Sequence, residues 1–177
     1  MSGRAVVLIG PMGAGKTSIG RKTARALHVP FTDTDISVAR DHGRISEIFA
    51  AHGEPRFREL EREAVEAALT SEGIVALGGG AVLHPDTRAD LAGHPVVLLT
   101  VDPRTVAGRI QGTSRPLLQG KDAMESWRRV MAEREGIYAE LADMTVDTST
   151  GHIRDIVERV VAWVQEQWAR DAREGSK

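Results

Sequence analysis

The sequence Gly10-Pro11-Met12-Gly13-Ala14-Gly15-Lys16-Thr17 decides how this chain folds. Its G-x-x-x-x-G-K-T spacing is typical of a phosphate-binding loop, and it follows an apolar run at residues 5–9 that is typical of a buried strand. A glycine-rich turn between a strand and a helix points successive backbone N–H groups inward, and the helix dipole adds positive potential there. The stretch therefore predicts that a nucleoside triphosphate binds through Gly13, Ala14, Gly15, Lys16, Thr17 and Ser18.

The last two positions of the loop carry side-chain chemistry. We expect Lys16 to reach the β- and γ-phosphates as a catalytic residue and the Thr17 hydroxyl to ligate Mg²⁺. The alternative is an ordinary glycine-rich turn between a strand and a helix. Four specified positions in the correct structural context favour phosphate binding over that alternative.

The composition limits what can surround the loop. With 177 residues, 41% of them hydrophobic, the chain can form one core, so we expect one domain over residues 1–170 and a flexible tail over 171–177. The polar composition after Val164 predicts loose order from Trp168 to Lys177. The absence of cysteine and of metal-ligand spacing among the six histidines argues against a structural metal. No apolar run approaches the roughly 18 residues that a membrane span needs. The net charge of −2 argues against a nucleic-acid partner, and we expect a soluble cytoplasmic monomer.

Apolar strand-like runs alternate with helical patterns along the chain. The strand-like runs lie at residues 5–9, 30–34, 74–77, 95–101 and 144–147. The helical patterns lie at residues 16–27, 45–51, 55–70, 87–91, 103–110, 123–140 and 152–168. This alternation predicts a three-layer α/β fold, in which helices cover both faces of a parallel sheet.

Two carboxylates, Asp33 and Asp35, fall where the second strand should end. Because residues two apart in an extended chain share a face, both are expected to point into the crevice beyond the strand ends, where open α/β sheets bind ligands. Asp33 would then hold Mg²⁺, and Asp35 would accept a hydrogen bond from an attacking hydroxyl. The alternative is that both acids only cap a helix that begins near Ile36.

Two further segments have the composition of a binding site. Arg58 and Glu61 lie three apart on a predicted helix, and a guanidinium held by a carboxylate is prepared for a bidentate contact with a substrate carboxylate. A solvated ion pair of little energetic importance is the alternative. The triplet Gly78-Gly79-Gly80 follows the third strand and would let a ligand approach the backbone, which a plain turn would explain equally well.

A glycine-bounded loop at residues 112–122 has the character of a lid. Lids over phosphoryl-transfer sites exclude water and often bring an arginine to the transferring group, and Arg115 is the candidate here. Arg134 lies on the predicted helix behind this loop. The alternative for Arg115 is a solvated surface position.

Taken in order and spacing, these segments resemble the shikimate kinases over nearly the whole chain, to about Asp147. The resemblance implies a P-loop fold like that of the nucleoside monophosphate kinases, with a five-stranded parallel sheet and a lid. It also implies transfer of the γ-phosphate of ATP to the 3-hydroxyl of shikimate with Mg²⁺ as cofactor, giving ADP and shikimate 3-phosphate. That reaction belongs to the pathway to chorismate and the aromatic amino acids.

The resemblance also assigns roles to single residues. It implies that Asp35 contacts the substrate hydroxyl, and that Arg58, Arg134 and the backbone of Gly79 contact the substrate carboxylate and ring hydroxyls. The remaining implied contacts are Lys16 and Arg115 to phosphate, Thr17 and Asp33 to Mg²⁺, and Arg109 to adenine. The chain departs from the family pattern at residues 148–152, where many members carry a further arginine near the adenine.

Three other functions compete with this interpretation. A guanine-specific switch normally reads its base with an Asn-Lys-x-Asp segment, and the chain contains no asparagine. A related P-loop kinase, acting on gluconate or on another cyclitol, would differ at Arg58 and Arg134, because a neutral acceptor needs no pair of arginines directed at a carboxylate. A non-catalytic binding module would not need Lys16, Thr17, Asp33 and Asp35 intact.

Overall fold

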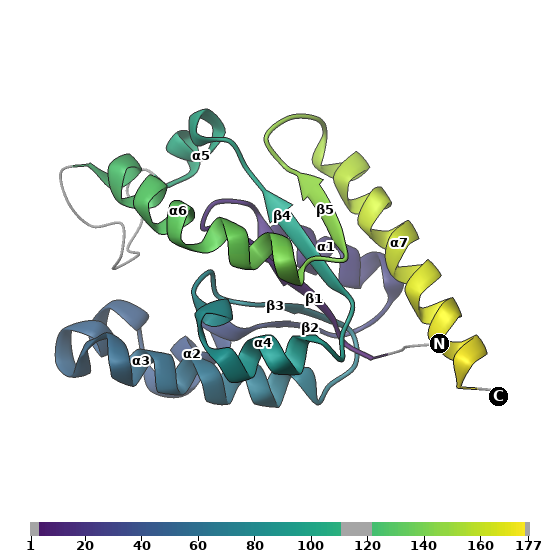
Figure 1. The fold of residues 1–177 in the computed structure, drawn as a ribbon, viewed down its shortest axis with the longest axis horizontal. Coiled ribbons are helices and arrows are strands. Elements are labelled where there is room, and N and C mark those ends of the chain that lie inside the picture. Colours follow the sequence, from purple (N-terminus) through teal and green to yellow (C-terminus); the bar gives the residue numbers. More distant parts are fainter. Residues whose placement is uncertain (1–3, 111–121, 176–177) are drawn as a thin grey trace.

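A five-stranded parallel sheet lies at the centre of the computed structural model, which describes residues 4–110 and 122–175 (Figure 1). The strands are β1 (Val6–Ile9), β2 (Phe31–Asp33), β3 (Ile74–Ala76), β4 (Val96–Thr100) and β5 (Met144–Asp147). Their order across the sheet is β2-β3-β1-β4-β5, with Val7 of the central strand opposite Val75 on one side and Val96 on the other. The predicted five-stranded parallel sheet is therefore confirmed.

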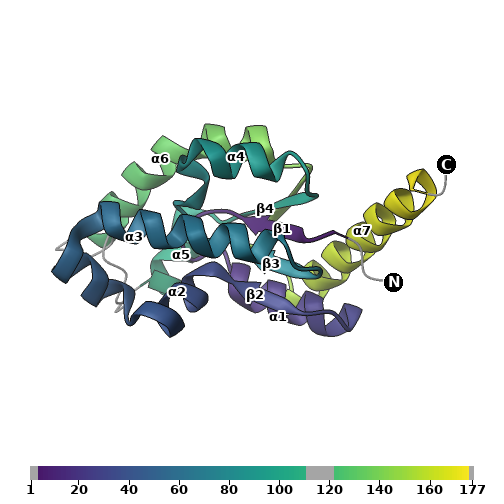
Figure 2. The ribbon, with the colours of Figure 1, turned by 90° about the horizontal axis from the view of Figure 1, so that it is seen from below.

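Helices cover both faces of the sheet, as the alternating pattern predicts. They are α1 (Lys16–Leu27), α2 (Thr34–His42), α3 (Ile45–Leu69), the 3-10 turn η1 (Ala81–Leu83), α4 (Pro85–Leu91), α5 (Pro103–Ile110), α6 (Ala123–Leu141) and α7 (Ile153–Glu174). Figure 2 shows α4 and α6 above the sheet and α1 beneath it. Within residues 4–110 and 122–175, no helix combines the length and the apolar character needed to cross a membrane.

The alternation of side chains along β1 divides the core between the two faces. Val6 and Leu8 pack in one cluster with residues of α1 and α7, whereas Val7 and Ile9 pack in a second cluster with residues of α3, α4 and α6. All four are buried, which is why this strand is apolar throughout rather than alternating with polar residues. The phosphate-binding loop follows directly from this rigid central strand.

The element α3 contains both of the helices that the sequence predicts at 45–51 and 55–70. It continues from Ile45 to Leu69, with a kink at Gly53, whose φ of 77° and ψ of 174° are not helical. Gly53 adopts this left-handed conformation without a Cβ penalty, and Pro55 then starts a new helical segment, where its missing N–H is not needed. The kink marks the junction between the two predicted helices.

The C-terminal segment is more ordered than the sequence predicts. Residues from Trp168 onward were expected to pack loosely, but α7 continues to Glu174, and Trp168 is buried with its indole donating to the Arg4 carbonyl at 3.0 Å. Arg4 in turn donates two hydrogen bonds to Asp171, at 2.9 and 3.0 Å. The N-terminal strand segment thus holds the end of the helix, a long-range contact that local periodicity does not reveal.

Candidate active site

The loops that follow β1, β2 and β3 meet at the carboxyl edge of the sheet, the edge at which open α/β sheets bind ligands. A cavity of about 230 Å³ opens there. It is lined by Met12, Gly13, Gly15, Lys16, Thr17, Ser18, Asp33, Asp35, Leu77, Gly79 and Arg109. The fold thus places the phosphate loop, both predicted acids and Gly79 of the triplet around one space.

The phosphate loop takes the conformation that its glycines predict. Gly13 and Gly15 have φ values of 83° and 91°, a region that residues with a Cβ rarely adopt, and α1 begins at Lys16. The Lys16 ammonium folds over the loop and donates to the carbonyls of Gly10 at 2.7 Å and Pro11 at 3.1 Å. The side chain of Ala14 is buried in the core, so this residue can contribute only its backbone to a ligand.

Asp33 uses its two carboxylate oxygens for two different contacts. One oxygen accepts from the backbone N–H groups of Asp35 at 3.0 Å and Ile36 at 3.2 Å, and so caps α2. The other accepts from the Thr17 hydroxyl at 2.6 Å. Capping and a place beside the predicted metal position, which the sequence left as alternatives, therefore coexist in one residue.

Asp35 lies in the first turn of α2 rather than on the end of β2. Both acids line the same cavity, as predicted. They reach it through a strand-to-helix turn, whereas the prediction had placed both on one face of an extended strand. Burial raises the pKa of Asp35 from 3.8 to about 6, and the carboxylates of Glu61 and Asp33 add to the increase. Lys16 and Arg58 act in the opposite direction on this pKa. The group is thus a carboxylate at neutral pH, with a basicity above that of an ordinary aspartate.

The glycine triplet forms the floor of the site, and charged side chains of the site pack directly against its backbone. A Cβ on Gly78 would lie 2.5 Å from an oxygen of Asp35 and 2.7 Å from an oxygen of Glu61. A Cβ on Gly80 would lie 2.6 Å from Nη2 of Arg58. Real Cβ atoms essentially never make contacts this close, so a side chain on Gly78 or Gly80 would displace the charged groups of the site.

Arg58 is held by two carboxylates on its own helix. Its Nη1 donates to Glu61 at 2.7 Å and its Nη2 to Glu54 at 2.9 Å. The Glu61 side chain is only 4% exposed, so the alternative of a solvated ion pair is wrong for this pair. Burial raises the pKa of Glu61, an effect that the neighbouring Arg58 opposes. The guanidinium is therefore oriented before any ligand arrives.

Arg134 on α6 reaches the same floor from the other side. Arg134 is only 3% exposed. If Gly79 carried a Cβ, that atom would lie 3.4 Å from Nη1 of Arg134. Its Nε has no hydrogen-bond partner among the residues that the structure describes. The two predicted substrate arginines thus approach the triplet at adjacent glycines, Arg58 at Gly80 and Arg134 at Gly79.

The same helix α6 touches both the phosphate loop and the triplet through residues to which the sequence assigned no role. The Trp127 indole N–H donates to the Met12 carbonyl at 2.9 Å, and the buried Tyr138 hydroxyl donates to the Gly79 carbonyl at 2.6 Å. Tyr138 lies one helical turn after Arg134 on α6. This spacing places both residues on one helix face, which is the sequence signal that could have identified Tyr138 as a site residue. Burial raises the pKa of Tyr138, which keeps its proton in place for the hydrogen bond.

Arg109, predicted to contact adenine, lines the same cavity as the phosphate loop. It donates to the Gly13 carbonyl at 2.9 Å and to the Thr148 carbonyl at 3.0 Å, joining the phosphate loop to the loop after β5. Arg115 and residues 112–121 of the predicted lid lie outside the described residues. Their assigned roles therefore stay predictions.

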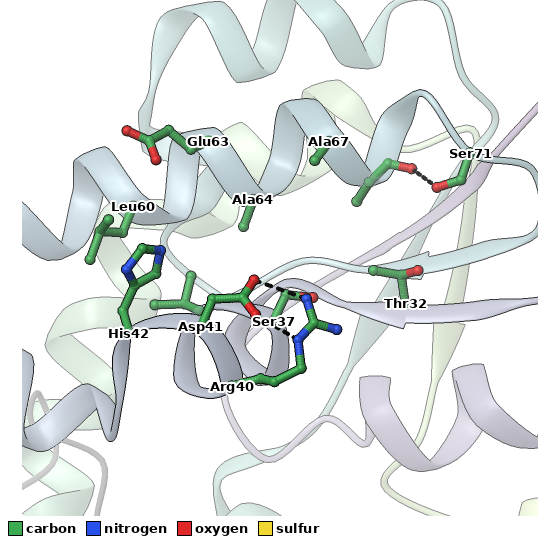
Figure 3. Close-up of a pocket in the computed structure, with 12 residues that line it drawn as sticks. Thr32, Ser37, Arg40, Asp41, His42, Leu60, Glu63, Ala64, Ala67 and Ser71 are labelled. Atoms are coloured by element: carbon green, nitrogen blue, oxygen red, sulfur yellow. Dashed lines mark hydrogen bonds and ion pairs between the residues drawn. The ribbon is translucent and has the colours of Figure 1, made fainter.

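A second hollow, of about 350 Å³, lies between α2 and α3 and is separate from this site (Figure 3). Polar groups such as Ser37, His42 and the exposed pair Arg40–Asp41 line it. None of its lining residues is shared with the cavity at the phosphate loop. None of the residues that the sequence predicts for the site lines this second hollow.

The phosphate loop on a parallel sheet, with Asp35 beside it, defines an ATP-dependent phosphotransferase with an alcohol acceptor. A family model described as shikimate kinase matches residues 12–165. The chain belongs to the shikimate kinase family.

Individual relatives agree with this assignment. The chain is 46% identical over 159 residues to a shikimate kinase from Mycobacterium avium, covering 88% of this chain and 90% of that protein. The structure of a shikimate kinase from Acinetobacter baumannii in complex with shikimate matches with a TM-score of 0.87 at 32% identity, over 93% of this chain and 94% of that one. A gluconokinase from Sinorhizobium meliloti matches with a TM-score of 0.62 at 18% identity, over 97% of both chains, which is a likeness of fold alone.

Proposed function

We propose that this chain transfers the γ-phosphate of ATP to the 3-hydroxyl of shikimate, with Asp35 at the acceptor oxygen and Arg58 and Arg134 at the acceptor carboxylate. The gluconokinase-like alternative is disfavoured, because that relative is similar only in fold. The proposal for the acceptor depends most on one observation, the state of the Arg134 guanidinium.

The two arginines at the triplet differ in how their charges are balanced. Arg58 is paired with Glu61 and Glu54, whereas Arg134 makes no ion pair with a carboxylate in the described part of the chain, although it is almost fully buried. The buried Glu61 compensates the charge of Arg134 only from a distance and is already paired with Arg58, and an incompletely compensated buried charge is unfavourable. An acceptor that brings its own carboxylate would complete this site, and a neutral polyol would not.

The residues around the loop supply the electrostatic part of the reaction. When phosphates enter the loop, the Lys16 ammonium exchanges the carbonyls of Gly10 and Pro11 for phosphate oxygens, and so balances the negative charge that develops during transfer. Because the transition state of phosphoryl transfer is loose, alignment of the acceptor oxygen with the γ-phosphorus matters more than strong basicity.

The Thr17 hydroxyl and one oxygen of Asp33 fit a magnesium ion. Their oxygens lie 2.6 Å apart, between the start of α1 and the end of β2. Mg²⁺ prefers oxygen ligands and retains several waters when it binds with a nucleotide. Thr17 would hold the ion and Asp33 would reach it, in part through water. The ion would neutralise phosphate charge during the transfer.

Asp35 orients the acceptor hydroxyl and accepts its proton. With a pKa of about 6, Asp35 is ionised at the pH of most cells yet more basic than a solvated aspartate. Its ionised form is the one that accepts a hydrogen bond, so we expect kcat/KM for the acceptor to fall below about pH 6, as Asp35 becomes protonated.

A coupled ADP-release assay tests the proposal. The wild-type protein is given shikimate, the methyl ester of shikimate, quinate, gluconate or no acceptor, with Mg-ATP constant. We expect turnover with shikimate, and a KM for the neutral ester higher by about a hundredfold, because the ester leaves Arg134 unpaired. Arg134→Gln should remove this preference, whereas Arg129→Gln, an exposed change on the same helix, should keep it. Equal KM values for acid and ester in the wild type would contradict the assignment of Arg134.

We further propose that the enzyme acts as a cytoplasmic monomer, with one domain closed by a lid at residues 112–122 that carries Arg115. Sedimentation at several protein concentrations tests the oligomeric state. Arg115→Ala should lower kcat by orders of magnitude with little change in ATP affinity, and a near-normal kcat would contradict the role given to Arg115.

A further inference from the structure

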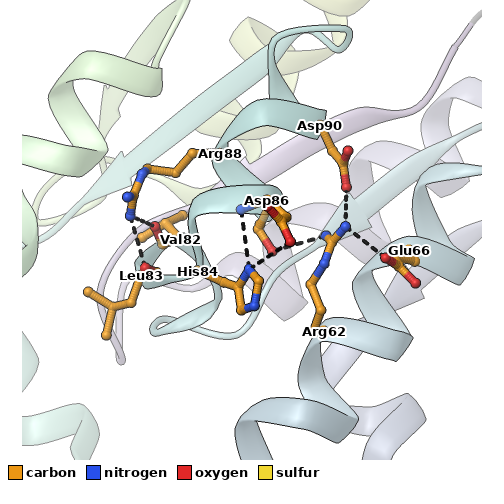
Figure 4. Close-up of polar contacts among 9 residues, drawn as sticks. Arg62, Glu66, Val82, Leu83, His84, Asp86, Arg88 and Asp90 are labelled. Atoms are coloured by element: carbon orange, nitrogen blue, oxygen red, sulfur yellow. Dashed lines mark hydrogen bonds and ion pairs between the residues drawn. The ribbon is translucent and has the colours of Figure 1, made fainter.

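A partly buried polar bridge joins α3 to α4 through Arg62 (Figure 4). The Arg62 guanidinium donates from Nη1 to the Thr87 hydroxyl at 3.2 Å, and from Nη2 to the Asp90 carboxylate at 2.5 Å. Nη2 also donates to Glu66, one turn along α3, at 2.9 Å. The Arg62 side chain is 15% exposed and Thr87 is buried, whereas Asp90 is 42% exposed, so water competes mainly at the Asp90 end of the bridge.

The α4 side of the bridge is connected to the floor of the acceptor site. Arg88 of α4 donates from Nη1 to the carbonyls of Val82 and Leu83, both at 2.9 Å, and these residues belong to η1. The turn η1 begins directly after Gly80. Through Arg88 and η1, the position of α4 therefore fixes the position of Gly80.

The α3 side of the bridge carries a residue of the acceptor site. Arg58 lies one helical turn before Arg62, and its guanidinium packs against the backbone of Gly80. The distance between Arg58 and the glycine floor therefore depends on how far α3 lies from η1 and α4. Since the contact at Gly80 leaves no room for even a Cβ, a small change in this spacing changes the site.

Hydrophobic packing holds α3 to η1 and α4 at Val65 and Ala68, which share a buried cluster with Val82 and Leu91, and not beside Arg58 and Arg62. A cavity of about 280 Å³ lies between the two sides of the bridge. It is lined by Arg58, Glu61, Arg62, Gly80, Ala81, Leu83, His84, Pro85 and Thr87. Within residues 4–110 and 122–175, the side-chain hydrogen bonds between α3 and α4 all come from Arg62.

We propose that Arg62 is a positioning residue for the acceptor: it sets the spacing between α3 and α4, and thereby holds Arg58 against Gly80, without touching the substrate. This inference rests on the proposed contact of Arg58 with the acceptor carboxylate. The phosphate loop follows β1 and leads into α1, and the bridge contacts neither element. Loss of the bridge should therefore affect the acceptor and leave ATP binding unchanged.

Steady-state kinetics with shikimate and ATP varied separately test this proposal. Arg62→Met keeps the apolar stem of the side chain and removes its charge, and Asp90→Asn weakens the bridge from its more exposed end. We expect each change to raise KM for shikimate roughly three- to tenfold, with KM for ATP and kcat within about twofold of wild type. The double variant should be no worse than the worse single variant, because both changes break the same contact.

Two further variants separate positioning from general stability. Glu66→Gln removes the partner within α3 but leaves the bridge to α4, so its KM for shikimate should match that of the wild type. Arg62→Lys can still reach Asp90 and should recover part of the lost affinity. Melting curves of all variants show whether they are folded.

The possible results distinguish this proposal from the proposed function. A folded wild type without shikimate-dependent turnover would overturn the proposed function and this inference with it. An active wild type with unchanged shikimate KM in Arg62→Met and Asp90→Asn would overturn this inference alone. Parallel changes in both KM values and kcat, or equal effects of Glu66→Gln, would also overturn it, because they would indicate a general loss of structure.

Discussion

Replacing Asp35 by asparagine should stabilise the protein while it abolishes turnover. The pKa of Asp35 rises from 3.8 to about 6 in the folded chain, chiefly through burial, so folding disfavours the ionised form. At 1.36 kcal/mol per pKa unit, this shift costs about 3 kcal/mol of stability at pH 8. Asp35→Asn removes the charge and should recover much of that free energy.

The raised pKa of Asp35 also determines how the stability of the protein changes with pH. Because the pKa in the folded state is higher than in the unfolded state, the folded protein binds more protons between about pH 4 and pH 6. Its stability therefore falls as the pH rises through this window, and the full penalty is present above about pH 6. The advantage of Asp35→Asn should grow from about 1 kcal/mol at pH 4.5 to about 3 kcal/mol at pH 8.

Urea unfolding of the two proteins at both pH values measures this advantage. Asp102→Asn is the matched control, since hydrogen bonding from Thr105 lowers the pKa of the exposed Asp102 and asparagine caps a helix equally well. The control should gain no stability at pH 8. A variant Asp35→Asn that is no more stable than wild type at pH 8, or whose advantage is the same at both pH values, would refute the reasoning. Its kcat should fall about a hundredfold or more.

Three further changes test single contacts of the site. Gly78→Ala places a Cβ against two carboxylate oxygens and should destabilise the protein by about 1–3 kcal/mol in urea unfolding, whereas Gly136→Ala, which meets nothing within 4 Å, should stabilise it by about 0.5–1 kcal/mol. Tyr138→Phe removes the hydrogen bond to Gly79 and should lower stability by about 1–2 kcal/mol and raise KM for shikimate; an unchanged melting temperature would contradict this. Thr17→Val should raise the Mg²⁺ concentration needed for half-maximal turnover, and an unchanged Mg²⁺ titration would exclude Thr17 as a ligand.

The sequence predicted most of the fold because each strand is short, apolar and followed by a distinct signal. The phosphate loop follows β1, Asp33 ends β2, and the glycine triplet follows β3. Since the carboxyl ends of parallel strands lie on one edge, these signals also predicted which residues share the site. The order of the strands was not available from local patterns, because it depends on contacts between residues distant in the chain.

The failures of prediction also have physical causes. Trp168 was placed in a loose tail, because its partner, the carbonyl of Arg4, lies at the other end of the chain. The burial of Glu61 and the bridge of Arg62 depend on tertiary packing, and charged residues on a helix are normally solvated.

The hydrogen bond from Trp127 to the Met12 carbonyl gives the nucleotide site an intrinsic optical reporter. Indole emission responds to the polarity around the ring and to its hydrogen bonding, and this ring lies on the loop that receives the phosphates. The other two tryptophans, Trp163 and Trp168, lie on α7 and supply a background that nucleotide does not reach directly. Occupancy of the loop can therefore be followed by unlabelled fluorescence titration, with Trp127→Phe as the blank.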